Sequence, residues 1–223
     1  MTRSGQGNPF CSASVIRMIE KHIDGLLDDL SKHYNFDRED DNFSNTPKRV
    51  AAAYHELLEG YGKDAGEILT TSFPSDNYDQ MIVCKDIDFF SICSHHMLPF
   101  FGKAAIGYIP GPSWSQEEID AASANGLATK SGKVVGLSKL ARIVQMYARR
   151  FQIQERMTMQ IATSLNDELT PAGVGVLVYD VKHLCMLMRG VKQHESTMDT
   201  SCMLGEFRDD PAVRQEFFSM VGR

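Results

Sequence analysis

Two short runs of cysteine and histidine limit how this chain can fold, because they must meet in space if they act together. The first run, CSHH, occupies positions 93–96, and the second, HLC, occupies positions 183–185, about ninety residues later. Together they contain two thiols and three imidazoles, the ligand types that zinc prefers. A C-x-x-H turn can direct both side chains at one centre, and two residues two apart share a face if they lie on a strand. The spacing therefore predicts a zinc site that joins the two runs.

The number of ligands suggests which kind of zinc site this is. A closed structural site needs four protein ligands, whereas a catalytic site uses three and leaves a position for water. Cys93, His96 and Cys185 would form such a set of three, with His95 and His183 beside the metal as proton carriers. The alternative is a group of buried Cys and His in a β-rich core, because free cysteine packs as a small hydrophobe. Spacing alone leaves both possibilities open.

Composition narrows the class of protein. A net charge of −6 argues against a general nucleic-acid binder, which needs a basic face. No stretch is long and apolar enough to predict a membrane span, and the N-terminus lacks the charged segment followed by an apolar segment that is typical of a secretory signal. Five cysteines, an odd count without the pattern of a small disulfide scaffold, fit a reducing compartment. We therefore expect a cytoplasmic protein that binds neither nucleic acid nor membrane.

Hydrophobic periodicity predicts the order of the elements. Helices are expected over 12–33, 47–59, 138–149 and 153–169 and after Pro211, and strands over 81–92, 101–109, 173–185 and within 195–207. Residues 111–133 form an excursion with one expected short helix, 115–124. The pattern is typical of the α+β class, with one mainly antiparallel sheet covered by helices on one face. We expect an N-terminal tail and helical region over 1–79 and one catalytic domain over 80–223.

Two further features bear on partners. The open edges of such a sheet must be paired or hidden, and pairing them between subunits predicts a homo-oligomer. Lys139, Arg142, Arg149 and Arg150 form a basic cluster within one segment, which could hold an anionic small molecule. A solvated helix face is the alternative interpretation of this cluster.

Several ordered motifs between residues 40 and 220 together resemble one family, GTP cyclohydrolase I. The resembling runs are NTPKR at 45–49, CSHH at 93–96, PFFG at 99–102, GLSKLAR at 136–142, QIQER at 152–156, HLC at 183–185, RG at 189–190 and TSCMLG at 200–205. The resemblance implies a T-fold subunit with an N-terminal helical extension, assembled as an oligomeric barrel. It also implies a homodecamer with active sites between subunits.

The same resemblance implies a hydrolase of pterin and tetrahydrofolate biosynthesis, and hence of one-carbon metabolism. The imidazole ring of GTP would be opened at C8, formate released and the skeleton reclosed as 7,8-dihydroneopterin triphosphate. Cys93, His96 and Cys185 resemble the ligands of one Zn²⁺ per subunit, which can lower the pKa of bound water to about 7. His95 and His183 resemble the acid/base histidines, because imidazole titrates close to neutrality.

The expected substrate contacts follow from the resemblance as well. Glu155 matches the residue that anchors guanine, whose adjacent N1–H and amine donors suit a carboxylate. A buried Glu155 would reject adenine, and Gln154 is its expected neighbour in the pocket. The positions that match triphosphate-binding residues are Ser138, Lys139, Arg142, Arg189 and Arg49.

The chain departs from the family pattern at Ser94, which stands where Glu is usual, and in the excursion at 111–133. Ser94 is not an expected ligand, so zinc binding should survive the change. Two alternatives remain: a T-fold nitrile reductase that uses a cysteine nucleophile, and a zinc-stabilised assembly protein without turnover. A zinc nucleoside deaminase would need P-C-x-x-C and H-x-E motifs, and neither is present.

Overall fold

A computed structural model describes residues 13–75, 78–111, 121 and 132–223 of the chain. The chain divides into two compact units, with the first ending at Gly62 and the second beginning at Lys63. Nearly all of the excursion at 111–133, and with it the expected helix at 115–124, lies outside the described residues.

The first unit contains the two predicted N-terminal helices, which are confirmed as α1 (Ala13–Tyr34) and α2 (Thr46–Leu57), followed by the 3-10 turn η2 (Glu59–Gly62). Pro47 lies in the first turn of α2, and Asn45 is at its N-cap without a capping side-chain bond. The apolar stripe of α1 is largely exposed, since no residue of this helix is buried. None of the helices in the described ranges has the combination of length and apolar character that crossing a bilayer requires.

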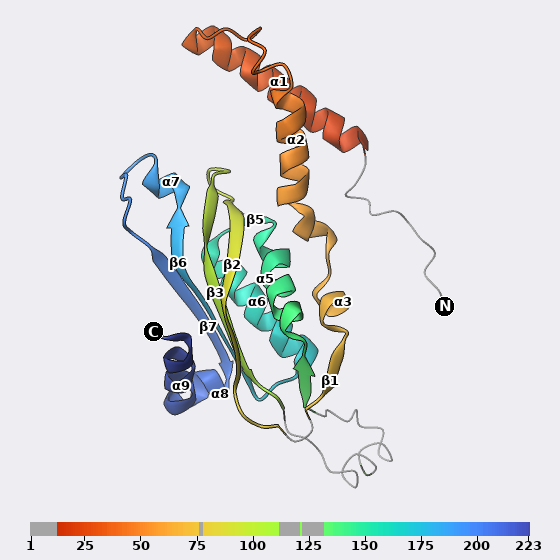
Figure 1. Cartoon of the computed structure of the whole chain (residues 1–223), viewed down its shortest axis with the longest axis vertical. Coiled ribbons are helices and arrows are strands. Elements are labelled where there is room, and N and C mark those ends of the chain that lie inside the picture. The colour runs from red at the N-terminus through yellow and green to blue at the C-terminus, as the bar shows by residue number, and fades with distance from the viewer. Residues whose placement is uncertain (1–12, 76–77, 112–120, 122–131) are drawn as a thin grey trace, which may run out of the picture. The chain divides into compact units, whose positions relative to one another are not determined.

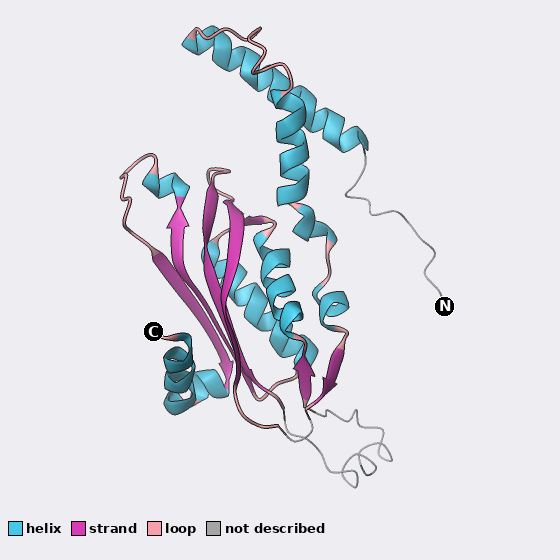
Figure 2. Ribbon diagram, in the orientation of Figure 1, coloured by secondary structure: helices cyan, strands magenta, loops and turns pink. Residues whose placement is uncertain are grey.

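The second unit is built on a five-stranded sheet with the order β5-β2-β3-β6-β7. Its strands are β2 (Ile82–Cys93), β3 (Pro99–Ile109), β5 (Phe151–Gln152), β6 (Gly173–His183) and β7 (Met198–Gly205). All neighbours are antiparallel except β5 and β2, which are parallel. The mainly antiparallel sheet is therefore confirmed. A small second sheet, β1 (Ser72–Pro74) with β4 (Lys133–Val135), was not predicted (Figure 2).

The larger helices of this unit cover one face of the sheet. They are α5 (Leu137–Ala148) and α6 (Gln154–Leu169), both as predicted, with the short α3 (Ala65–Leu69) beside them. Ile143 of α5 and Ile161 of α6 are fully buried in the same cluster as Ile106 and Val176, which point to this face from alternate strand positions. This cluster is the main core of the protein.

The prediction that helices lie on one face only is wrong. The short helices α8 (Glu206–Asp209) and α9 (Pro211–Val221) lie on the other side of the sheet from α5 and α6 (Figure 1). Their Phe207 and Phe217 form a second buried cluster with Leu177 and Tyr179 of β6. The physical reason is visible in β6, whose side chains are apolar on both faces, a pattern of strands that are covered twice.

Removing Phe217 should test how much this second cluster stabilises the fold. Its side chain is fully buried, and a Cβ on Gly107 would lie 2.7 Å from its ring, so the sheet is shaped around it. We expect Phe217→Ala to cost about 3–5 kcal/mol of unfolding free energy. Urea unfolding at fixed protein concentration measures this change. Met220→Ala, on the same helix but 43% exposed, is the matched control, and equal midpoints for the two variants would contradict the expectation.

Candidate active site

The first cysteine and histidine run forms a tight turn at one end of the sheet. Strand β2 ends at Cys93 and β3 begins at Pro99. The backbone N–H of Cys93 donates to the carbonyl of Leu98 at 2.9 Å, and the N–H of Met97 donates to the carbonyl of Cys93 at 2.9 Å. Met97 adopts a positive φ of 55°, which reverses the chain. His96 is thereby held close to the end of the strand that carries Cys93.

Strand β6 brings the second run to the same end of the sheet. His183 is paired in register with Phe100 of β3, and β6 ends at His183. The predicted strand to residue 185 is wrong at its end, because Cys185 lies in the short helix α7 (Leu184–Leu187). His183 and Cys185 therefore do not share a strand face, and the helical turn redirects the thiol.

The structure brings the three predicted ligands together despite this change. The ligand atoms of Cys93, His96 and Cys185 all lie within 4.8 Å of one another. In a tetrahedral zinc site with bonds of 2.0–2.3 Å, ligand atoms are roughly 3.5 to 4 Å apart, so a small adjustment would let them converge on one ion. Cys93 is buried, Cys185 is partly buried and His96 is exposed, so the group opens to solvent on one side.

The chemistry of the donor set also fits a metal. Burial raises the pKa of the Cys185 thiol, and the adjoining Cys93 thiol raises it further. Two neighbouring thiols resist ionising together, whereas a divalent cation between them stabilises both thiolates. The side chains of Cys93, His96 and Cys185, called the metal group below, could therefore hold a metal ion.

The turn that carries Cys93 and His96 is held in place by the short strand β5. Cys93 pairs with Gln152, and the backbone N–H of Ser94 donates to the Gln152 carbonyl at 2.9 Å. The buried Gln152 side chain is itself held by the Arg156 guanidinium at 3.0 Å and by Gln160 at 2.9 Å. Ser94 takes part in this contact through its backbone N–H, and a glutamate at this position would have the same backbone N–H. The departure at Ser94 therefore leaves this support intact.

His183 lies beside the metal group in a partly buried position. Its ring stacks on Phe100, with centroids 4.6 Å apart and planes at 7°. Its Nε2 is 2.8 Å from Oε1 of Gln154. Burial lowers the pKa of His183, and the nearby Glu155 carboxylate opposes this effect. The environment therefore favours the neutral imidazole, which can accept a proton.

His95 and Arg189 also lie at this end of the sheet. The exposed His95 ring is edge-on to His96, with centroids 6.3 Å apart. The exposed Arg189 follows α7, and its Nη1 donates to Nε2 of His96 at 3.0 Å. A cation and a second imidazole thus border the metal group on its open side.

The first turn of α6 places Gln154 and Glu155 differently from what the sequence suggests. Glu155 is exposed in this chain, whereas the expectation was a buried carboxylate. The side chain of Gln154 is 1% exposed and is occupied by protein contacts, so a direct contact with guanine stays a prediction. Because Glu155 is near His183, it can still face a base bound beside the metal.

Three of the remaining predicted residues, Ser138, Lys139 and Arg142, belong to helix α5. Ser138 and Lys139 lie in the first turn of α5, whereas the residues that follow its last turn lead into β5, which pairs with the end of β2 at Cys93. A helix of 12 residues is about 18 Å long, which separates these two residues from the site; Arg142 lies one turn further along. Arg49 belongs to α2 in the first unit. Binding of the triphosphate by these residues stays a prediction.

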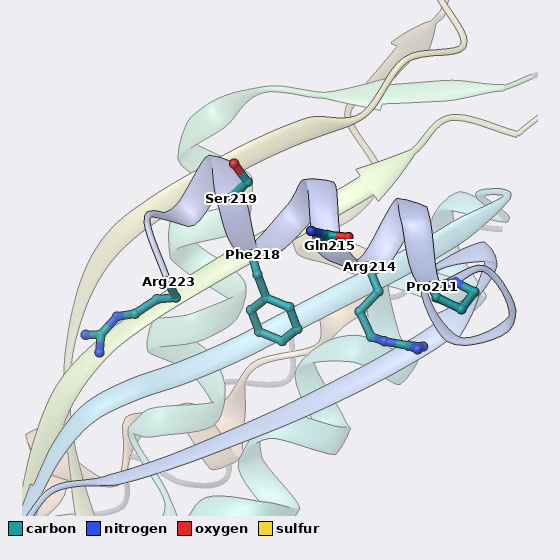
Figure 3. A pocket seen from close by; sticks show the side chains of 6 residues that line it. All are labelled: Pro211, Arg214, Gln215, Phe218, Ser219 and Arg223. Carbon is teal, nitrogen blue, oxygen red and sulfur yellow. The ribbon is translucent and has the colours of Figure 1, made fainter.

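A surface hollow of about 350 Å³ lies beside α9 (Figure 3). It is lined by Pro211, Arg214, Gln215, Phe218, Ser219 and Arg223. Its two arginines are already engaged, since Arg223 pairs with Asp180 and Arg214 donates to the carbonyls of Phe207 and Arg208. These two arginines therefore connect parts of the protein, and we assign the hollow no ligand.

Comparison with known proteins agrees with the site. The sequence profile of a family described as GTP cyclohydrolase I matches residues 19–114 and 127–222. A GTP cyclohydrolase 1 from Chlorobium phaeovibrioides is 41% identical over 94% of this chain and 82% of its own length. A GTP cyclohydrolase 1 from Methylococcus capsulatus is 41% identical over 90% of this chain and 97% of its own. A third relative, GTP cyclohydrolase 1 1 of Pseudomonas aeruginosa, is 44% identical over 87% and 97%.

Proposed function

Because the chain belongs to the GTP cyclohydrolase I family, we propose that it opens the imidazole ring of GTP at C8 in a zinc-dependent reaction. Formate would leave and the skeleton would reclose as 7,8-dihydroneopterin triphosphate. The observation that carries this proposal is the convergence of Cys93, His96 and Cys185 beside a half-buried His183. When bound there, zinc supplies the acidity that allows water to attack C8 near neutral pH.

The two histidines would move protons during ring opening and reclosure. His183 is favoured in its neutral form, so it can take a proton from the attacking water and return it to a purine nitrogen. The exposed His95 stands on the open side of the metal group, where a second proton transfer to the ring would take place. Arg189 beside His96 provides positive charge for the phosphate end of the substrate.

Glu155 would select guanine, and replacing its charge should reduce activity toward GTP. A glutamine has one acceptor and one amino group, and the amino group would oppose a guanine donor. Hydrogen bonds to charged groups contribute about 1.5–3 kcal/mol, so we expect Glu155→Gln to lower kcat/KM by about a hundredfold. Steady-state kinetics with GTP measures the loss. Glu168→Gln, an exposed carboxylate at the other end of α6, is the control, and an equal loss there would refute selection by Glu155.

We propose that the working form is a homo-oligomer, with the decamer of the family as the expected size. Ser138 and Lys139 lie about a helix length from the metal group of their own chain, so another copy would supply these triphosphate contacts. Two features of the chain support assembly. Apolar residues of α1 are exposed to solvent, such as Met18 at 57%. Strand β7 is at the edge of the sheet, with no further strand beside it among the described residues.

The test of the proposed function is GTP turnover by the purified protein with bound zinc quantified. Formate release and the fluorescence of the oxidised pterin should rise together and stop when zinc is removed by a chelator. Formate without pterin would show ring opening without reclosure, and would contradict the proton-transfer roles. A protein with stoichiometric zinc and no reaction would instead be an assembly protein of the same fold.

A further inference from the structure

A group of polar side chains contacts the ring of His183 through Gln154; Gln154 and Thr158 are buried and Thr200 is partly buried. Gln154 and Thr158 come from the first turns of α6, and Thr200 comes from β7. Gln154 Nε2 donates to the carbonyl of Met198 at 3.0 Å and to Oγ1 of Thr200 at 3.1 Å. The hydroxyls of Thr158 and Thr200 are 2.8 Å apart, and Thr158 Oγ1 donates to the Gln154 carbonyl at 2.8 Å. The group therefore ties helix α6 to strand β7.

The direction of every hydrogen bond in this group can be deduced. The Thr158 hydroxyl uses its hydrogen on the Gln154 carbonyl, so its oxygen must accept from Thr200. The Thr200 hydroxyl has then used its hydrogen and can only accept from Gln154. The carbonyl of Met198 also can only accept. Because the Thr200 hydroxyl and the Met198 carbonyl can only accept here, the Gln154 side chain must direct its NH₂ at these two atoms. The Gln154 oxygen then faces His183.

This orientation determines the tautomer of His183. The Gln154 oxygen accepts at 2.8 Å from Nε2 of His183, so Nε2 must carry a hydrogen. In the neutral ring Nδ1 is then the nitrogen with the free lone pair. A rotated Gln154 amide would place its oxygen against the Met198 carbonyl, and both Gln154 and Thr158 are 1% exposed, so water cannot compensate.

We propose that Thr200 and Thr158 are positioning residues, which hold the Gln154 amide so that His183 presents Nδ1 as its proton acceptor. This inference rests on the proposed role of His183 in turnover. It assigns Gln154 a place behind the catalytic histidine, because the amide has its oxygen on His183 and its nitrogen on β7. The stacking of the His183 ring on Phe100 limits the remaining rotation, so the ring is held by one contact on its face and one at its edge.

The variant Thr200→Val tests the proposal, because it keeps the shape of the side chain and removes only the hydroxyl. Gln154 then keeps one of its two acceptors, and the amide is less firmly held. We expect kcat for GTP to fall about tenfold with KM nearly unchanged, and Thr200→Ser to restore most of the loss. The control is Thr163→Val, the same change at an exposed position of α6.

A second measurement follows the tautomer without relying on activity. Solid-state ¹⁵N spectra of histidine-labelled protein distinguish a protonated Nε2 from a protonated Nδ1, and the His183→Ala spectrum identifies the signals of His183. The wild type should show Nε2–H, and Thr200→Val should show a mixture. A kcat equal to that of Thr163→Val, a raised KM with unchanged kcat, or a wild-type spectrum with Nδ1–H would overturn the proposal.

The catalytic role of His183 and the positioning role of Thr200 would be contradicted by different results. If His183→Ala keeps normal turnover, the proposed catalytic role of His183 is wrong, whatever the spectra show. If His183→Ala is inactive while Thr200→Val has normal kcat and spectrum, the role of His183 stands and the positioning role of Thr200 is wrong.

Discussion

Replacing Cys185 with alanine should abolish both zinc binding and GTP turnover. Cys185 is one of three proposed ligands whose donor atoms lie within 4.8 Å of one another, and two ligands would hold zinc far more weakly. Loss of a metal that stabilises the transition state by several kcal/mol lowers kcat/KM by at least about a thousandfold. Metal analysis by mass spectrometry and formate release, measured on the same preparation, give the two quantities.

The matched control for this variant is Cys202→Ala. Cys202 is also a partly buried free thiol of the second unit, but it lies on β7 and packs against the main core. It should keep one zinc per chain and near-normal turnover. The assignment of Cys185 as a ligand would be wrong if Cys185→Ala retained stoichiometric zinc.

Replacing His183 with alanine should abolish most of the turnover while zinc stays bound. General acid–base catalysis contributes about 10²–10⁴-fold, so kcat should fall within that range. Zinc content should be unchanged, because His183 bonds to Gln154 and stacks on Phe100, outside the three-ligand group. Together with Cys185→Ala, this variant separates loss of the metal from loss of the proton carrier.

His194→Ala is the control for the histidine change. His194 is exposed in the segment between α7 and β7, where its backbone carbonyl accepts from Lys182 at 3.4 Å. Its imidazole should not affect the reaction. A kcat for His183→Ala within a few-fold of the wild type, or a loss of zinc equal to the loss of activity, would remove His183 from the catalytic role.

The resemblance to the family predicted the same surroundings for Glu155 and Gln154, and the structure gives them different ones. Both were expected at the guanine, and the structure places them at the start of α6 beside His183. Glu155 is exposed and free to meet a substrate, whereas the Gln154 side chain lies inside the protein. Two neighbours in sequence thus point to different surroundings, because successive positions of a helix differ by about 100°.

The sequence by itself determined the long helices and strands and pointed to the candidate metal ligands. Apolar spacing identified the long helices and the strands, because a helix or strand buries one face with its own period. The types and spacings of Cys and His predicted three candidate metal ligands, because few residue types bind such metals, and the structure brings these three side chains together. Phe217, by contrast, was expected in the final helix and Phe207 at the end of the last strand range, but no buried partner was predicted for either.

Only the tertiary structure decided how the side chains are directed. It placed Cys185 in α7, put α8 and α9 on the second face of the sheet, and brought Thr200 behind His183. Each of these results depends on strand register and on contacts between residues far apart in the chain, which no local pattern contains. A metal group can be recognised from its ligands alone, whereas the hydrogen bonds that orient its neighbours appear only when α6 and β7 are packed together.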